Sequence, residues 1–311
     1  MSTPKDFLSL ADWKAADLRR ILARAHELKR SYRRGETPQT LRGRTLAMYF
    51  EKPSLRTHVT FEAGMSQLGG HAILLRPEQV GIGTRESAAD VARNLSRWVH
   101  GIVARTYDHA LVEELAAAAT IPVINGLTDL LHPCQAMADL QTIAERAELE
   151  KVAVAYVGDG NNVANSLLNA FAVLGGELRL ATPRSHQPAL QVRQRVTALA
   201  AASGARITYT EDPVEAVRGA HFVYTDVWTS MGQEAESALR KALFEPFQVN
   251  SRLLRHAPDA LVMHCLPAHR GEEITDDVLD GEHSIVFDQA ENRLHAQKAI
   301  LEALLMVPAA S

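Results

Sequence analysis

The sequence has few cysteines and no long apolar stretch, and each shortage excludes a class of protein. Cys134 and Cys265 are the two cysteines, too few for a disulfide framework or a four-cysteine zinc site, so we expect reduced thiols. Apolar stretches such as 152–157 are far shorter than the roughly 20 residues of a membrane helix. The N-terminus has neither a secretory signal nor a presequence pattern. These features predict a cytoplasmic protein with no membrane partner.

The chain also lacks an excess of positive charge. Lys and Arg total 33, against 37 Asp and Glu, for a formal net charge of −4. Proteins that bind nucleic acid or anionic membranes usually carry a basic surface, so we expect neither as a partner. Any anionic ligand is then bound by a small local group of residues.

The 311 residues are enough for two domains with separate cores. Short apolar runs typical of strands alternate with amphipathic stretches typical of helices, which favours mainly parallel sheets covered by helices. The first series has expected strands at 46–50, 72–75, 101–104 and 121–124, and expected helices at 12–29, 59–68, 87–99, 111–119 and 136–149.

A second series of the same kind follows, so the predicted fold class is α/β, with two three-layer domains. Because ligands of parallel sheets sit beyond the carboxyl ends of the strands, we expect the active site in the interdomain cleft. We place the boundary near residue 148, giving domains 1–148 and 149–311, and expect the last helix, 292–305, to pack back on the first domain. The second series of expected strands is 152–157, 178–181, 207–209, 222–224, 261–264 and 285–287.

A turn suited to an oxyanion follows the first expected strand. Ser54, Arg56 and Thr57 bring two hydroxyls and a guanidinium to the start of a helix, where backbone amides attract anions. This combination suits a phosphate. The structural alternative is that Ser54 caps the helix and Arg56 is solvated.

Polar side chains also follow the expected strands at 101–104 and 121–124. Arg105 ends one of them, and His132 and Gln135 come after the other, three residues apart at the start of a helix. That spacing lets them hold the oxygen and the amino group of a small planar amide. Taken alone, a histidine such as His132 more often has a capping or structural role.

Gly158-Asp159-Gly160 opens the second series in the manner of a dinucleotide-binding turn. Position 163 is Val rather than the third glycine, and no acidic residue ends the strand at 178–181. We therefore expect no nicotinamide cofactor. Asn162, at the head of the following helix, is a candidate for hydrogen bonds to a substrate carboxylate or amine.

The remaining candidates lie later in the chain. Asp226 offers a carboxylate for a substrate ammonium, and Ser230-Met231-Gly232 follows it as a segment able to close. Cys265 and Leu266 follow another strand, where a cysteine is usually a small buried hydrophobe unless its surroundings polarise it. Arg293, early in the last helix, has the alternative role of a surface charge.

Five blocks, in order along the chain, resemble the ornithine carbamoyltransferase family over nearly the whole length. The resemblance implies transfer of the carbamoyl group of carbamoyl phosphate to the δ-amine of L-ornithine, giving citrulline. Arginine biosynthesis is the expected pathway, and arginine breakdown stays an alternative because both use the same pocket. It also implies a homotrimer, or a multiple of trimers, that uses no metal or organic cofactor. The blocks are Ser54-Leu55-Arg56-Thr57, His132-Pro133-Cys134-Gln135, Asp226 with Ser230-Met231-Gly232, His264-Cys265-Leu266-Pro267 and Gln289-Ala290-Glu291-Asn292-Arg293.

The same resemblance implies roles for single residues. In the first domain carbamoyl phosphate is bound, and in the second ornithine is bound. The implied catalytic residues are Cys265, Arg56, Arg105 and His132. The implied carbamoyl phosphate ligands are Ser54, Leu55, Arg56, Thr57, Arg105, His132, Gln135, Cys265, Leu266 and Arg293, and the implied ornithine ligands are Asn162, Asp226, Ser230 and Met231.

Several alternatives stay open at this point. The attacking amine must lose a proton, and either Cys265 or the departing phosphate can accept it. Putrescine or an N-acylated ornithine are alternative acceptors, although the block around Asp226 resembles the one that serves free ornithine. Two alternatives lie outside the carbamoyltransferases. They are a nicotinamide-dependent dehydrogenase and a non-catalytic sensor of carbamoyl phosphate.

Three positions depart from the family pattern. Leu55 and His58 stand where the family commonly has a Thr and a second Arg. We expect these changes to alter affinity rather than chemistry, since His58 can replace part of the charge if protonated. Gly81 stands where relatives often carry a Gln or His that reaches a neighbouring subunit's site, which weakens the case for a shared site.

Overall fold

The computed structural model describes residues 4–229 and 237–306. The chain forms two compact units: unit 1 comprises Met1–Gln141 and Glu291–Ser311, and unit 2 comprises Thr142–Ala290. The chain passes from one unit to the other inside helix α6 (Pro133–Ala144) and returns inside helix α13 (Val286–Leu305). In the described part of the chain, no helix is long and apolar enough to cross a membrane.

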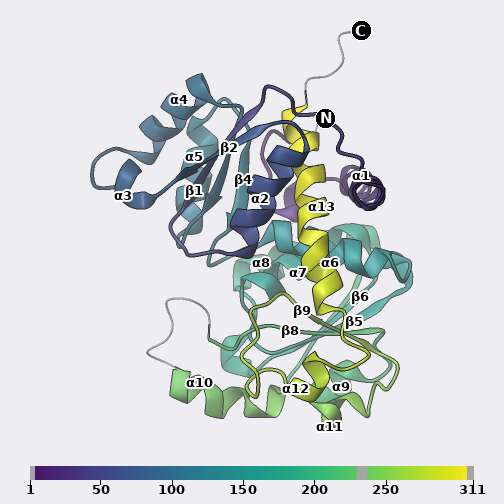
Figure 1. Ribbon diagram of the computed structural model, residues 1–311. Helices are drawn as coiled ribbons and strands as arrows, with labels where there is room; N and C mark the ends of the chain where they lie inside the picture. The colour runs from purple at the N-terminus through teal and green to yellow at the C-terminus, as the bar shows by residue number, and fades with distance from the viewer. Residues whose placement is uncertain (1–3, 230–236, 307–311) are drawn as a thin grey trace. The chain divides into compact units, whose positions relative to one another are not determined.

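Unit 1, whose strands β1, β2 and β4 are labelled in Figure 1, is built on a four-stranded parallel sheet with the strand order β2-β1-β3-β4. The strands β1, β3 and β4 are almost entirely buried, as expected for strands covered on both faces, whereas β2 is partly exposed. The bounds are β1 Thr45–Phe50, β2 His71–Leu75, β3 Gly101–Arg105 and β4 Val123–Leu127, with helices α1 Ala15–Arg33, α2 Arg56–Gln67, α3 Pro77–Val80, α4 Ala88–Trp98 and α5 His109–Ala118 and a 3-10 turn at Leu10–Asp12.

Helices cover both faces of the unit 1 sheet. On one face, α4 and α5 pack their buried residues, among them Val91, Leu95 and Val112, against Ile102 of β3. On the other face α2 lies against α13, close enough that a Cβ on Gly64 would be 3.2 Å from the Lys298 side chain. The register pairs Phe50 with Arg105, so the polar residues that follow β1 and β3 share one edge of the sheet.

Unit 2 is built on a five-stranded parallel sheet with the order β7-β6-β5-β8-β9. The order reverses at β5, which has β6 on one side and β8 on the other, and such a switch point is where ligands bind in open α/β sheets. The bounds are β5 Ala153–Val157, β6 Glu177–Ala181, β7 Arg206–Thr210, β8 Phe222–Thr225 and β9 Leu261–His264, with helices α7 Asn162–Leu174, α8 Leu190–Ser203, α9 Pro213–Val217, α10 Ser237–Phe244, α11 Ser251–Leu254 and α12 Asp276–Leu279 and 3-10 turns at Leu149–Lys151, Arg184–His186 and Glu245–Phe247.

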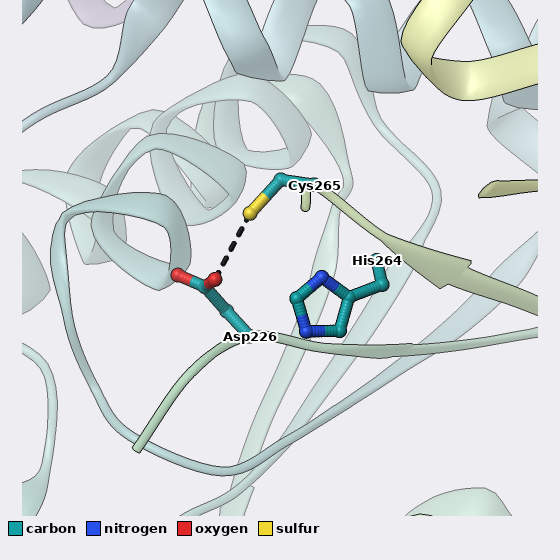
Figure 2. Close-up of side chains that lie close together, drawn as sticks. All are labelled: Asp226, His264 and Cys265. Carbon is teal, nitrogen blue, oxygen red and sulfur yellow. Dashed lines mark hydrogen bonds between the residues drawn. The ribbon is translucent and has the colours of Figure 1, made fainter. Parts of the chain in front are cut away.

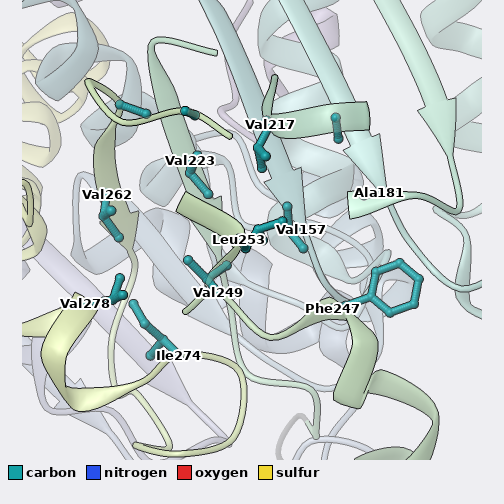
Figure 3. Packing of buried hydrophobic residues seen from close by; sticks show 14 of the residues in the cluster. Val157, Ala181, Val217, Val223, Phe247, Val249, Leu253, Val262, Ile274 and Val278 are labelled. Carbon is teal, nitrogen blue, oxygen red and sulfur yellow. The ribbon is translucent and has the colours of Figure 1, made fainter. Parts of the chain in front are cut away.

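The core of unit 2 lies under the centre of its sheet. Figure 3 shows Val157, Val223 and Val262, from the three adjacent strands β5, β8 and β9, packed with residues of the surrounding helices and turns. Val217 and Leu253 are two of those residues, and both are buried. Burial of this kind stabilises the edge where the strands end, and the candidate residues Asp226 and Cys265 follow directly.

The α/β fold class with two mainly parallel sheets is confirmed, and nine of the ten expected strands are present. The expected strand at 285–287 is wrong, because α13 begins at Val286. The backbone here forms only a short bridge to β9, through the Ile285 amide and the Val262 carbonyl (3.0 Å). The Ile285 carbonyl then accepts the first hydrogen bond of the helix, from the Gln289 amide (2.9 Å). The prediction failed because three apolar residues are too few to distinguish the period of a strand from that of a helix.

Two expectations about the arrangement stay predictions: the functional boundary near residue 148 and the location of the active site between the domains.

Candidate active site

The turn after β1 is held by the hydroxyl of Ser54, which accepts a hydrogen bond from the Thr57 amide at 3.1 Å. This is the capping bond expected of a serine at a helix start. Thr57 is buried, whereas the Leu55 side chain is 73% exposed. The turn therefore directs Thr57 into the protein and leaves Leu55 outside, where its replacement of a threonine disturbs no buried contact.

A buried guanidinium joins the predicted residues of unit 1. Arg293, at 3% exposure, donates through Nη2 to Thr57 Oγ1 at 2.5 Å and through Nη1 to Gln135 Oε1. Arg105 Nη1 donates to the same threonine oxygen at 3.4 Å. The surface-charge reading of Arg293 is thereby wrong. Four residues predicted from separate parts of the sequence form one hydrogen-bonded group.

His132 lies within this positive environment. Burial lowers the pKa of its imidazole well below the usual value, and the nearby guanidiniums of Arg293, Arg105 and Arg56 lower the pKa further. A neutral imidazole can donate one hydrogen bond to a carbonyl oxygen without carrying a charge of its own. The group therefore combines fixed cations, which attract an anion, with a neutral donor suited to a polar carbonyl.

Lys52 belongs to the same region and was not singled out from the sequence. Its side chain is 3% exposed, and the ammonium forms an ion pair with Asp129 and lies 4.4 Å from the centre of the Tyr107 ring. It is also one of the cations that lower the pKa of His132. Its place two residues after the end of β1 and two residues before Ser54 was the signal available in the sequence.

Two of the three departures have a structural explanation. His58 Nε2 lies 3.1 Å from Glu62 one helical turn later, so the side chain is engaged on the surface of α2. Gly81 ends α3 with φ 70°, and a Cβ there would lie 2.7 Å from the Cβ of Arg85. Glycine is favoured at that position because other residues are strained in the left-handed region.

In unit 2 the predicted residues Asp226 and Cys265 meet at the ends of the adjacent strands β8 and β9. The Cys265 thiol donates to Asp226 Oδ1 at 2.9 Å, as Figure 2 shows. The other carboxylate oxygen, Oδ2, accepts a hydrogen bond from Asn161 Nδ2 at 2.7 Å. Both oxygens thus have donors, which holds the carboxylate in one orientation.

A buried ion pair lies beside this carboxylate. Asp159, from the turn after β5, pairs with Arg240 of α10, and Arg240 Nε also donates to the Trp228 carbonyl at 2.6 Å. Burial raises the pKa of Asp159 to about 7, a rise that Arg240 opposes and the nearby Asp226 reinforces. The sequence reading of Asp159 as part of a dinucleotide-like turn missed this pairing.

His264 supports the backbone at Cys265. Its Nδ1 accepts from the Leu266 amide at 2.8 Å, so its proton is on Nε2 and is donated to Glu273 at 3.0 Å. Leu266 has φ 57°, an unusual value for a non-glycine residue. The buried pair of His264 and Glu273 therefore stabilises the sharp backbone turn at Leu266, the residue that follows Cys265.

Asp226, His264 and Cys265 also offer three possible metal-ligand atoms within 4.8 Å of one another. Oxygen, nitrogen and sulfur donors of this kind suit zinc. Both ring nitrogens of His264 already have partners in the protein, however, and metal binding would break one of those bonds. The contacts agree better with a hydrogen-bond network than with a metal centre.

Of the other predicted ornithine ligands, only Asn162 lies within the described residues. Asn162 is the first residue of α7 and is half-buried. Ser230 and Met231, together with Gly232, lie outside the described residues.

Both halves of the chain match family models. Residues 5–145 match the aspartate/ornithine carbamoyltransferase carbamoyl-P binding domain, and residues 150–304 match the Asp/Orn binding domain of the same family. The chain belongs to the aspartate/ornithine carbamoyltransferase family. The expectation drawn from the five sequence blocks is confirmed at the level of the family.

Close relatives extend over almost the whole chain. An ornithine carbamoyltransferase of Anoxybacillus flavithermus is 53% identical over 97% of this chain and 96% of its own. An anabolic ornithine carbamoyltransferase of Pyrococcus furiosus is 52% identical with the same coverage. The solved structure of ornithine carbamoyltransferase from Pyrococcus furiosus superposes with a TM-score of 0.94 at 50% identity, covering 97% of both chains.

Proposed function

We propose that the protein transfers the carbamoyl group of carbamoyl phosphate to the δ-amine of L-ornithine, producing L-citrulline and phosphate. The observation that carries the proposal is the buried group in unit 1, where Arg293 joins Thr57 and Gln135 beside Arg105 and His132. Fixed cations next to a neutral donor suit a small anion that also carries an amide. The relatives named ornithine carbamoyltransferase support the same reaction.

In this proposal the phosphate of the first substrate is bound by the turn at Ser54 and by Arg56, Arg105 and Arg293. As the carbon–oxygen bond to phosphate breaks, negative charge grows on the leaving group, and preorganised cations stabilise it. His132 and Thr57 donate to the carbonyl oxygen as it becomes an oxyanion. Leu55 contributes a backbone amide, and Gln135 holds the amino group of the carbamoyl moiety.

Ornithine is assigned to the residues of unit 2. Asp226 and Asn162 bind its α-substituents together with Ser230 and Met231, while Cys265 and Leu266 line the place of reaction. The amine nitrogen forms a bond to the carbamoyl carbon, the bond to phosphate breaks, and the amine releases a proton. Because the Cys265 proton is engaged with Asp226, the thiol could accept a second proton only by passing its own to the carboxylate, which favours the phosphate as the acceptor.

A citrulline assay with purified protein tests the proposal. Carbamoyl phosphate is supplied with ornithine, putrescine, N-acetylornithine or aspartate, and phosphate release is measured in parallel. We expect equal amounts of citrulline and phosphate with ornithine and far slower turnover with the others. Binding of carbamoyl phosphate without turnover for any of the four acceptors would instead indicate a sensor.

Arg56→Ala tests the phosphate site directly. Removal of this guanidinium from the turn is expected to lower kcat/KM by at least about a hundredfold, the effect typical of removing one group that stabilises transition-state charge. The matched control is Arg93→Ala, because Arg93 is an exposed arginine of α4 that pairs with Asp90 on the surface. Near-normal citrulline production by a folded Arg56→Ala variant would contradict the assignment.

The rival reading as a dehydrogenase has a specific observation against it. In dinucleotide-binding turns the second glycine leaves room for the pyrophosphate. Here a Cβ on Gly160 would lie 2.3 Å from the backbone nitrogen of Pro188 and 2.5 Å from the His186 carbonyl oxygen. The space beside this glycine is filled by the chain itself.

We also propose a cytoplasmic homotrimer that serves arginine biosynthesis. The support is the resemblance to the family and the name of the anabolic relative from Pyrococcus furiosus. Light scattering is expected to give about three times the chain mass of 34.1 kDa.

A further inference from the structure

Asn161 connects two parts of unit 2 that carry proposed ornithine ligands. It ends the turn after β5 and is the N-cap of α7, whose first residue is Asn162. Its Oδ1 accepts hydrogen bonds from the amides of Val163 at 2.9 Å and Ala164 at 3.2 Å. Its Nδ2 donates to Asp226 Oδ2, at the end of β8, at 2.7 Å.

The two ends of the amide are chemically different, so this arrangement is directional. Oδ1 can only accept, and the helix amides and the Tyr156 hydroxyl (3.3 Å) are donors. Nδ2 can only donate, and the carboxylate is an acceptor. A flipped amide would place Oδ1 against the carboxylate and Nδ2 against the helix amides, so both sets of contacts select the same orientation.

The contact also defines the orientation of Asp226. Its carboxylate is 6% exposed and receives Cys265 on Oδ1 and Asn161 on Oδ2. Two donors on opposite oxygens oppose rotation of the carboxylate. Removal of Asn161 Nδ2 leaves one oxygen without this donor.

We propose that Asn161 is a positioning residue for ornithine, holding Asp226 and the head of α7 at a constant separation so that Asp226 and Asn162 contact the same substrate molecule. This inference rests on the proposed function, because it takes ornithine as the ligand of both residues. Asn161 acts through its neighbours, so its loss should weaken ornithine binding while leaving the carbamoyl phosphate site of unit 1 unaffected.

Two variants separate positioning from capping. Asn161→Ser keeps a good helix cap but is too short to reach Asp226, and Asn161→Ala loses both functions. For both variants we expect the KM for ornithine to rise about tenfold, the change typical of losing one hydrogen bond to a charged group, with little change in the KM for carbamoyl phosphate. Only Asn161→Ala should also lower the melting temperature markedly, because it alone loses the cap.

A substrate analogue and a control variant complete the test. Inhibition by 5-aminopentanoate, which lacks the α-amino group, should be nearly the same for wild type and Asn161→Ser if the link acts through Asp226. Asn250→Asp is the matched control, since Asn250 caps α11 through the Leu253 amide at 3.0 Å and aspartate is an equally good cap. Its kinetic constants should equal those of the wild type.

The outcomes separate the two hypotheses. If the wild type produces no citrulline, the proposed function is wrong and the inference falls with it. If the wild type is active and Asn161→Ser has an unchanged KM for ornithine, or raises both KM values equally, the positioning role alone is wrong.

Discussion

The histidine at position 295 is expected to make unit 1 less stable in mild acid. His295 is fully buried on α13, two residues after Arg293, with its ring 5.5 Å from that of Tyr32. Burial lowers its pKa from 6.5 to about 4, and the ammonium of Lys298 adds to this, although Glu291 opposes it. The folded protein therefore keeps the ring neutral at a pH where the unfolded chain protonates it.

The size of the effect follows from linkage. Above the unfolded pKa of 6.5 both states carry a neutral ring, so His295 contributes no pH dependence. Below that value the unfolded state binds a proton that the folded state does not, and stability falls until the pH reaches the folded pKa of about 4. With these two pKa values the loss between pH 7.5 and pH 5 is about 2 kcal/mol.

His295→Phe and His295→Gln remove this proton uptake. Either change adds a packing cost, but a cost that does not depend on pH cancels when the two pH values are compared. Each variant should therefore gain about 2 kcal/mol relative to the wild type as the pH falls from 7.5 to 5. The free energy of unfolding at each pH is measured by urea titration with tryptophan fluorescence as the signal, since Trp13 is buried in the same unit.

His256→Gln, at an exposed histidine of unit 2, controls for the loss of an imidazole as such. The reasoning fails if both His295 variants show the same stability difference from wild type at the two pH values. It also fails if the wild type becomes relatively more stable in acid, because that would mean that the folded state binds the proton.

Two further predictions concern unit 2. Gly160→Ala should destabilise the protein by about 2 kcal/mol or more in urea unfolding, because its Cβ would clash with the backbone of residues 186–188. Gly64→Ala, inside helix α2, should cost less, because its Cβ would come no closer than 3.2 Å to a side-chain carbon of Lys298 and its nearest neighbours outside its own helix turn are side-chain atoms rather than backbone. Equal effects of the two changes would contradict the clash. Cys265→Ser keeps a donor to Asp226, so we expect steady-state kinetics to show less than about a tenfold loss in kcat, whereas a loss of a hundredfold or more would indicate that the thiol is the general base.

Much of the fold could be predicted because its determinants are local. Apolar runs such as 152–157 alternate with amphipathic stretches, and the period of each is a property of neighbouring residues. The anion-binding turn was also readable, since Ser54, Arg56 and Thr57 are consecutive or nearly so. The segment 285–287 was misread because three apolar residues fit a strand and a helix start equally well.

The roles of the other site residues depended on distant partners. Arg293 was compatible with a surface charge until its guanidinium was found on Thr57, 236 positions earlier. Asn161 gave no signal of its contact with Asp226, because a capping asparagine and a positioning asparagine have the same sequence pattern. Such contacts depend on which strand ends are adjacent, and strand order is a property of the whole sheet.

The sequence by itself determined which residues could form strands, helices and an oxyanion turn, since those preferences arise within a few residues of the chain. Only the tertiary structure decided which side chains are buried together, and with that the neutral state of His132 and the orientation of Asp226. The physical reason is that desolvation, charge–charge interaction and hydrogen bonding depend on distance in space, whereas a sequence pattern records distance along the chain.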